Sequence, residues 1–338
     1  MANHQPVVVV PNWNGEQDLA ACLDSVLSQS VKAHIIVVDN GSVDGSVKLI
    51  EEKYPDIELI KHAKNLGYAG GVNAGFRRAI ELGAKYAAPF NNDAVADKDW
   101  LKHLVDFLDE NESYGIATCK VISADGKFLD STGDLYTTWG LPYPRGRGET
   151  DLDKYDDETE VFGASGAASL YRVEMLEEIG LFDEDFFAYY EDVDLSFRAQ
   201  LAGWKVAFVP KSQVFHKIGG TSSRIRGFTA YQTLKNPPML LLKNVPRKYF
   251  WYATRRNLVA QVTFFISAAL RGHLWSAVKG KTVCISLFFK NLRKRKQIQS
   301  TKKVSDEYIW SMLVHDLPPN AAKLRAFRGF FWKLRGKS

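Results

Sequence analysis

An aspartate followed by a short polar stretch ends one of the apolar runs of the chain. Asp39 follows residues 35–38 and precedes Asn40, Gly41 and Ser42. Its carboxylate could accept a hydrogen bond from N3–H of uracil or thymine, and the glycine would let the backbone approach a ligand closely. An aspartate at this place can also cap the turn that follows it, and taken alone this second interpretation is the stronger.

Two further segments have residue types that suit a diphosphate and a cation. Residues 65–75 are rich in glycine and open an expected helix, whose N-terminus is a favourable place for a diphosphate. Asn91, Asn92 and Asp93 follow the apolar run 86–90. A carboxylate there could bind a divalent cation that also bridges phosphate oxygens. A plain polar turn is the alternative, because Asn and Asp are common turn residues.

An acidic cluster stands where a later helix is expected to start. Glu191, Asp192 and Asp194 follow Tyr189 and Tyr190. Acids in the first turn of a helix interact favourably with its dipole, which accounts for one or two of the three. A carboxylate beside a sugar site could instead deprotonate an incoming hydroxyl group.

A histidine lies beyond the last apolar run of this half of the chain. His216 follows the expected strand Lys205–Val209, which Pro210 should close. A neutral imidazole could supply a metal ligand, although a single histidine is more often a surface or structural residue.

The elements that must position these residues alternate between strands and helices. Short apolar runs typical of buried strands alternate with stretches whose apolar residues recur at helical spacing. This alternation predicts an α/β fold with a largely parallel central sheet covered on both faces, whose ligands bind at the carboxyl ends of the strands. Residues 123–160 are rich in turn residues and predict a mobile loop over the site. Strands are expected over 7–10, 35–38, 58–62, 86–90, 116–122 and 205–209, and helices over 19–27, 46–53, 71–82 and 100–108.

The charge of the chain is unevenly distributed. The 338 residues carry a net charge of +5, but residues 231–338 contain 22 Lys and Arg and only three acids. That stretch carries +19, which leaves −14 for the rest. Such asymmetry indicates a basic part that meets an anionic surface, either nucleic acid or anionic lipid. We expect an α/β domain over residues 1–230 and a basic, mainly helical region over 231–338, with Asn236-Pro237-Pro238 breaking the chain near the start of the basic region.

Cysteine usage and the N-terminus indicate the compartment. The three cysteines are widely scattered, and the first residues do not combine a basic stretch with a long apolar core. We therefore expect a reducing, cytoplasmic environment, with no disulfide framework and no signal peptide.

Taken together and in this order, the segments resemble family 2 glycosyltransferases of the GT-A fold. The resemblance runs from Val7 to about Ser223. Each segment is weak alone, whereas the ordered set is highly specific. The matching segments are 10–15, 38–42, 65–75, 91–93, 180–187, Glu191-Asp192 and His216.

The resemblance implies a role for each matching residue. Asp192, beside Glu191, matches the general base that deprotonates the acceptor. Asp93 matches the last carboxylate of the family's Asp-x-Asp metal motif, and His216 resembles the ligand that completes a site for Mg²⁺ or Mn²⁺. The first Asp of that motif is replaced by Asn91, a form that looks like that of bacterial rhamnosyltransferases. The residues assigned to the nucleotide are Pro11, Asn12, Asn14, Asp39, Gly41, Asn65, Gly67, Asn73 and Asn92.

The resemblance therefore implies an inverting, metal-dependent enzyme that moves a sugar from a nucleotide-sugar donor to a lipid-linked glycan acceptor, in bacterial cell-surface polysaccharide synthesis. It suggests dTDP-rhamnose as the donor. UDP-hexose or UDP-galactofuranose is the alternative donor. A membrane-docked protein that binds a sugar nucleotide without turning it over is the alternative from another class. Asn91 favours that last alternative, and the presence of the other acids and of His216 argues against it.

The basic region has features of a membrane-surface segment. Leu258–Leu270 is an apolar run of 13 residues, too short for the roughly 20 needed to span a bilayer. Basic helices with Trp and Phe on one face lie in the membrane interface. We expect the protein at the inner face of the cell membrane, bound to anionic lipid. A helical subdomain packed on the catalytic core or in a homo-oligomer remains the alternative, whereas nucleic-acid binding is not expected because no module for it is visible.

Overall fold

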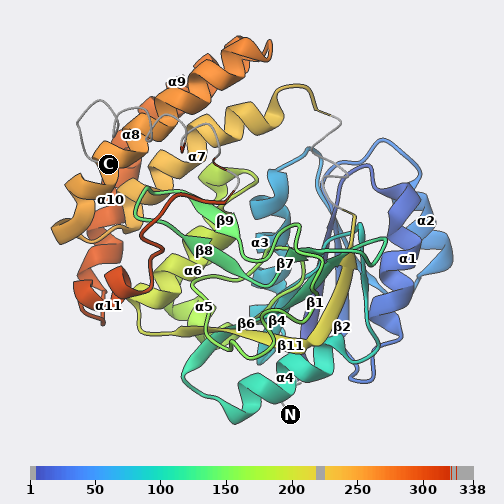
Figure 1. Cartoon of the computed structure of the whole chain (residues 1–338). Coiled ribbons are helices and arrows are strands. Elements are labelled where there is room, and N and C mark those ends of the chain that lie inside the picture. Colours follow the sequence, from blue (N-terminus) through green and yellow to red (C-terminus); the bar gives the residue numbers. More distant parts are fainter. Residues whose placement is uncertain (1–4, 218–224, 320, 322–324, 326–338) are drawn as a thin grey trace. The chain divides into compact units, whose positions relative to one another are not determined.

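The computed structural model describes residues 5–217, 225–319, 321 and 325 and divides into two units (Figure 1). The first unit comprises residues 1–134 and 144–224, and the second comprises 135–143 and 225–338. The expected domain boundary after residue 230 stays a prediction. Residue 230 lies within the helix Phe228–Asn244. The assignment of 135–143 to the second unit has no counterpart in the sequence pattern.

The first unit is built on a mixed sheet in the order β3–β2–β1–β4–β10–β6–β11–β5, with β7 paired to β6. Its strands are β1 (Val7–Asn12), β2 (His34–Asp39), β3 (Glu58–Lys61), β4 (Tyr86–Pro89), β5 (Ala94–Ala96), β6 (Tyr114–Ser123), β7 (Leu129–Ser131), β10 (Leu170–Arg172) and β11 (Lys205–His216). The pairs β1–β2, β2–β3, β1–β4 and β6–β11 are parallel. Strand β10 lies antiparallel between β4 and β6. The predicted α/β fold is confirmed.

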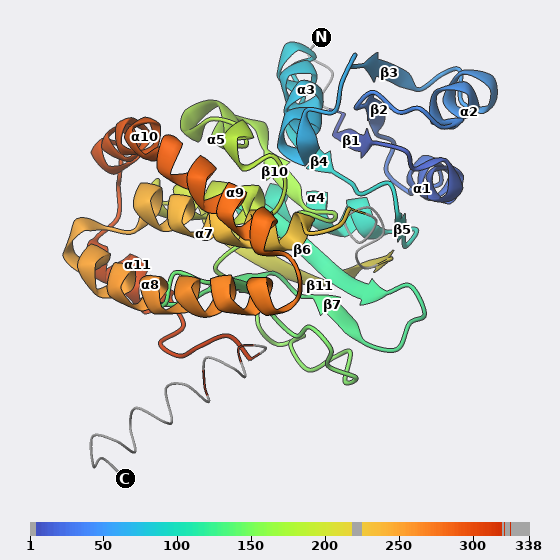
Figure 2. The same cartoon turned by 90° about the horizontal axis from the view of Figure 1, so that it is seen from above.

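Helices cover both faces of this sheet (Figure 2). Val8 and Val10 of β1 share a buried cluster with apolar residues of α1 and α4. Successive side chains of a strand point to opposite faces, so Val9 faces the other way, where Gly75 of α3 packs against its side chain. The helices of this unit are α1 (Glu16–Leu27), α2 (Ser46–Lys53), α3 (Gly67–Glu81), α4 (Trp100–Glu110), α5 (Val173–Ile179), the short 3₁₀ helix η1 (Glu184–Phe186) and α6 (Glu191–Leu201).

Two expectations for the segment between residues 123 and 216 are wrong. Strand β11 does not end at Pro210 but continues to His216, and its register against β6 shifts between Val209 and Gln213. Such an irregularity accommodates a proline, which has no N–H to give to a ladder. The loop expected over 123–160 contains β7, together with β8 (Asp134–Tyr136) and β9 (Pro142–Pro144), which pair with each other. Polar residues such as Asp130 are buried in β7, so the strand has no apolar signature.

The second unit is helical, as the sequence predicts. Its helices are α7 (Phe228–Asn244), α8 (Arg247–Leu270), α9 (Leu274–Ser286), α10 (Phe288–Ser300) and α11 (Asp306–Ser311). Helix α7 packs against α8, α9 and α10. No helix in the described part of the chain combines the length and the apolar character that crossing a bilayer requires.

The expected break at Asn236-Pro237-Pro238 is wrong, because α7 continues through both prolines. A proline inside a helix leaves the carbonyl four residues earlier without its usual N–H donor. For Pro237 that carbonyl belongs to Thr233, and it accepts a hydrogen bond from Nε2 of Gln261 on α8 at 3.3 Å. A side chain of the neighbouring helix thus replaces the missing backbone donor.

Candidate active site

Asp39, at the end of β2, receives hydrogen bonds from the protein on both carboxylate oxygens. The backbone N–H groups of Gly41 and Ser42 donate to Oδ2 at 3.1 and 3.0 Å. The Ser42 hydroxyl donates to Oδ1 at 2.5 Å and the Asn12 amide at 3.1 Å. The turn-capping interpretation of Asp39 is therefore correct. Its role in reading a pyrimidine base stays a prediction.

The ends of β1 and β4 are joined through two asparagines. Nδ2 of Asn92 donates to Oδ1 of Asn12 at 2.7 Å. A Cβ atom on Gly15 would lie 2.1 Å from that Nδ2, so a larger residue here would displace the Asn92 side chain. Asn14 adopts a positive φ of 51°, and its Oδ1 accepts a hydrogen bond from the backbone of Val43 at 2.8 Å.

Pro11 lies buried in β1, with its Cα opposite that of Val38. Together with the contacts of Asp39 and Asn92, this places four of the predicted nucleotide residues around the ends of three adjacent strands. They are Pro11, Asn12, Asp39 and Asn92.

The glycine-rich segment turns into α3 against the chain that precedes α6. Oδ1 of Asn65 accepts from the Gly67 N–H at 2.7 Å. Gly67 has a φ of +78°, and a Cβ there would meet the carbonyl oxygen of Phe187 at 2.3 Å. That carbonyl accepts from the Ala69 N–H at 3.1 Å, so one of the first N–H groups of α3 is already occupied.

Asn73, on α3, has a different environment from the one expected of a nucleotide ligand. It is buried, and its amide donates to the Phe182 carbonyl at 2.9 Å and to Glu184 at 3.0 Å. Its oxygen accepts from the Phe182 N–H at 3.0 Å. In this structure Asn73 positions residues 182–184, and its contact with nucleotide stays a prediction.

The backbone that leads into α6 is strained. Phe187, Tyr189 and Tyr190 have φ values of 65°, 67° and 74°, a region that residues other than glycine rarely adopt. Each such residue costs about 1–3 kcal/mol, and such strain clusters at functional sites. The strained segment delivers Glu191 and Asp192 to the first turn of α6.

Asp192 is held by backbone donors on both oxygens. Gly166 N–H donates to Oδ2 and Val193 N–H to Oδ1, both at 2.8 Å. Burial raises the pKa of Asp192, and the backbone hydrogen bonds oppose this effect. A raised pKa suits a carboxylate that must take up a proton near neutral pH. The neighbouring Glu191 is also buried. Burial raises the pKa of Tyr68, and the charge of Glu191 raises it further.

A short segment of small residues, 165–168, connects these parts. Its Gly166 N–H binds Asp192, and its Gly166 carbonyl accepts from the Tyr68 hydroxyl of α3. The Ala167 carbonyl accepts from the Asn91 N–H at 2.9 Å. The sequence reasoning overlooked this segment, although a run of small residues is the signal that marks a close approach of backbone to side chains.

Asp93 and His216 lie together, with a partner that the sequence did not reveal. Nε2 of His216 lies 3.2 Å from Oδ1 of Asp93 and 3.2 Å from the Asn91 amide nitrogen. Nδ1 lies 2.8 Å from Oδ2 of Asp130, whose other oxygen pairs with Arg147 at 2.7 Å. Burial alone would lower the pKa of His216, but the two carboxylates outweigh it and raise the pKa to about 9.

A known family model matches the part of the chain that contains the predicted nucleotide residues and Asp93. The model of glycosyl transferase family 2 matches residues 7–180, which include β1, β2, the start of α3 and the Asn91–Asp93 turn. The chain belongs to this family.

The relatives of this family 2 glycosyltransferase include two rhamnosyltransferases. It is 27% identical over 300 residues to the N-acetylglucosaminyl-diphospho-decaprenol L-rhamnosyltransferase of Mycobacterium tuberculosis (strain ATCC 25618 / H37Rv), which covers 81% of this chain and 93% of the relative. It is 25% identical over 254 residues to the dTDP-rhamnosyl transferase RfbF of Shigella flexneri, covering 72% and 81%. The predicted resemblance to rhamnosyltransferases is confirmed.

A solved structure shares the fold. The mannosyltransferase PcManGT from Pyrobaculum calidifontis, in complex with GDP-Man and Mn²⁺, matches with a TM-score of 0.51 at 18% identity, covering 88% of this chain and 84% of that one. The likeness supports the predicted GT-A fold of this family 2 glycosyltransferase.

Two of the predicted metal ligands lie together in the structure. No group of three or more His, Cys, Asp or Glu among residues 5–217 and 225–319 is arranged to hold an ion. Asp93 and His216 supply one carboxylate oxygen and one imidazole nitrogen that face each other. Ions that bind with nucleotides take further ligands from phosphate and water, and Nε2 must release its proton to bind one. The pair therefore fits an ion that enters together with a diphosphate.

Proposed function

We propose that this glycosyltransferase transfers rhamnose from dTDP-rhamnose to a lipid-linked glycan acceptor, with inversion at the anomeric carbon, in the synthesis of a bacterial surface polysaccharide at the cytoplasmic face of the membrane. The donor is supported by the two relatives, one a dTDP-rhamnosyl transferase and the other an L-rhamnosyltransferase for a diphospho-decaprenol-linked sugar. The same relative from M. tuberculosis supports the acceptor class.

One observation carries the mechanism. The segment 165–168 binds Asp192 through the Gly166 N–H and the Asn91–Asp93 turn through the Ala167 carbonyl. A base for the acceptor and a carboxylate for the leaving diphosphate thus depend on adjacent residues of one segment. A single displacement needs the attacking and leaving groups on opposite sides of one carbon, so its base and its diphosphate site must keep a fixed relative position, and a shared segment supports this.

The reaction that we propose is an in-line displacement. The acceptor hydroxyl oxygen attacks the anomeric carbon while its proton passes to the Asp192 carboxylate. The bond between the anomeric carbon and the diphosphate oxygen breaks, and its electron pair leaves with the nucleoside diphosphate. Gly166 N–H keeps the Asp192 carboxylate oriented during this step. No covalent sugar–enzyme intermediate is required.

Asp93 and His216 would hold Mg²⁺ or Mn²⁺, whose charge stabilises the departing diphosphate. Mn²⁺ in the complex of the mannosyltransferase that shares the fold supports this assignment. Asp130 would orient His216 by accepting its Nδ1–H, as carboxylates do for many histidine ligands.

The test is the release of nucleoside diphosphate by the purified protein from a panel of nucleotide sugars. We expect release from dTDP-rhamnose only when a polyprenyl-diphosphate-linked sugar and Mn²⁺ or Mg²⁺ are present, with NMR of the product showing the inverted anomer. Equal release from UDP-hexose or UDP-galactofuranose would contradict the donor. Nucleotide binding without turnover of any donor would favour a non-catalytic binding protein.

A further inference from the structure

Exposed apolar side chains gather on one stretch of the second unit. Of the 18 large apolar or aromatic side chains that are exposed in the described part of the chain, 13 lie between Trp251 and Leu292. Scattered exposed apolar residues are normal on a protein surface, but a concentration of this kind marks a surface that binds something.

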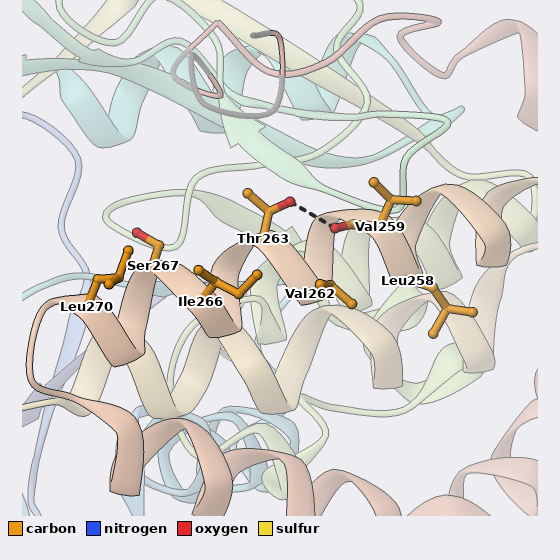
Figure 3. A pocket seen from close by; sticks show the side chains of 7 residues that line it. All are labelled: Leu258, Val259, Val262, Thr263, Ile266, Ser267 and Leu270. Carbon is orange, nitrogen blue, oxygen red and sulfur yellow. Dashed lines mark hydrogen bonds between the residues drawn. The ribbon is translucent and has the colours of Figure 1, made fainter. Parts of the chain in front are cut away.

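Helix α8 shows the feature in its clearest form. Leu258, Val262, Ile266 and Leu270 are 60%, 59%, 53% and 80% exposed. Their spacing of four residues aligns them along one side of the helix. They line a shallow apolar groove together with Val259, Thr263 and Ser267 (Figure 3). We call Leu258, Val262, Ile266 and Leu270 the apolar row.

The fully buried residues on the opposite side of α8 are polar or small, and the half-buried Phe264 packs there beside them. Asn257 and Gln261 are buried there with Ala260 and Ala268. Asn257 donates to the carbonyls of Trp139 and Gly140, both at 3.2 Å, and Gln261 donates to Thr233 on α7. A surface helix of a water-soluble domain normally buries its apolar side. In α8 this arrangement is reversed, because large aliphatic side chains face outward and two amide side chains face inward.

The charges around this surface have one sign. From Phe228 to Ser300 the chain has 14 lysines and arginines and no aspartate or glutamate. Arg271 and Lys279, both exposed, lie on either side of Trp275 in the sequence, which is 80% exposed. Aliphatic and aromatic side chains mixed with cations are typical of protein segments that lie in the interface of an anionic bilayer.

We propose that the apolar row of α8, together with Trp275 and its flanking cations, is a docking face for an anionic lipid bilayer, with α8 lying in the plane of the interface. Charge argues against two other occupants. A second copy of the chain would bring an equally cationic face against this one. The C-terminal residues 326–338, which lie outside the described residues, contain four basic residues and no acid, so their charge also disfavours them as the occupant. The inference does not depend on the donor or acceptor proposed above.

The test uses the full chain and vesicles of phosphatidylcholine with and without about 30 mol% phosphatidylglycerol. We expect sedimentation with the anionic vesicles at low salt, weaker but measurable sedimentation at high salt, and little with neutral vesicles. The double variant Val262→Asp/Ile266→Asp should bind the anionic vesicles about tenfold or more weakly, because it places two charges in the row.

Leu27→Asp is the matched control. Leu27 is 54% exposed on α1, so its replacement adds a negative charge at a similar exposure in the other unit. We expect it to bind vesicles like the unchanged protein. If the double variant binds as tightly as Leu27→Asp, the row is not a membrane surface. If the double variant changes the oligomeric state in gel filtration and keeps its vesicle affinity, the row is a subunit contact and the proposal is overturned.

Discussion

Nδ1 of His216 lies 2.8 Å from Oδ2 of Asp130, across 86 residues of sequence. Asp130 is buried in β7, and hydrogen bonding to His216 and the charge of Arg147 hold the pKa of its carboxyl below the usual value, although burial acts to raise it. An ionised carboxylate only accepts hydrogen bonds, so Nδ1 carries the proton. The other ring nitrogen is thereby directed to Asp93.

We therefore expect Asp130→Asn to weaken Mn²⁺ binding in the presence of dTDP by about 10–100-fold, the usual effect of losing such a partner. Electron paramagnetic resonance of free Mn²⁺ measures this without any turnover. Asp56→Asn is the control, because it removes an acid that is exposed on the surface. Unchanged Mn²⁺ affinity in Asp130→Asn would show that Asp130 does not position a metal ligand.

Asp93→Ala should weaken the binding of dTDP only when a divalent cation is present. In EDTA the Asp93 carboxylate has no cation to share with the diphosphate and can only repel it, so removal of Asp93 should not weaken dTDP binding there. Calorimetric titrations of both proteins, with Mn²⁺ and with EDTA, give four affinities to compare. Four equal affinities would exclude Asp93 as a metal ligand.

Asp192→Asn should lower the rate of transfer by about 10²–10⁴-fold, which is the usual contribution of a general base. Donor binding should stay nearly intact, because the proposed role of Asp192 concerns the acceptor hydroxyl. An activity assay and calorimetry with dTDP measure the two properties separately. Near-normal turnover would contradict the assignment of Asp192 as the general base, and Glu191→Gln would then be the variant to test.

The pH profile should carry the signature of Asp192. Burial raises its pKa, so its basic form is lost at a higher pH than for an ordinary aspartate, near 3.9. Burial raises the pKa of Asp134, and the charge of Asp192 raises it further. The two carboxyl groups therefore titrate together, and the pKa seen in a pH profile belongs to the pair. We expect kcat/KM to fall on acidification well above pH 4. A profile that stays flat down to pH 4 would contradict this expectation.

Gly166→Ala should impair catalysis by moving the base. A Cβ at this position would lie 2.8 Å from Oδ2 of Asp192, closer than real Cβ contacts, so the carboxylate must shift. A misplacement of about 1 Å can cost about 10²-fold in rate. We expect kcat to fall while dTDP affinity is retained. The control is Gly163→Ala, where the new atom would meet Ser196 at 3.1 Å instead. Equal losses in both variants would indicate a general packing defect.

Much of the fold could be predicted because its central strands and helices bury apolar residues in regular patterns. All six residues of β1 are buried, and α1 buries Leu19, Cys22, Leu23 and Val26 at helical spacing. The inserted strand β10 was missed because its three residues are too few for a periodic signal.

The remaining misses share one cause, since each depends on a partner distant in sequence. In the sequence Pro237 indicates the end of a helix, but in the structure Gln261 replaces the hydrogen-bond donor that the proline lacks. In the sequence Asp130 is indistinguishable from a turn residue, but in the structure its carboxylate is paired with His216 and Arg147. The hydrogen bonds of Asn73 to Phe182 and Glu184 likewise join residues far apart in sequence, whereas its contact with the nucleotide stays a prediction.

The hydrogen bonds on the inner side of α8 also fix its rotation. One residue of an α-helix corresponds to about 100° around its axis, so turning the apolar row inward would pull Asn257 away from Gly140 and Gln261 away from Thr233. The carbonyl left by Pro237 would then lose its donor inside the protein. If the row docks on a bilayer, the protein therefore cannot turn this surface inward on leaving the membrane, and the cationic charge around it would oppose self-association in water.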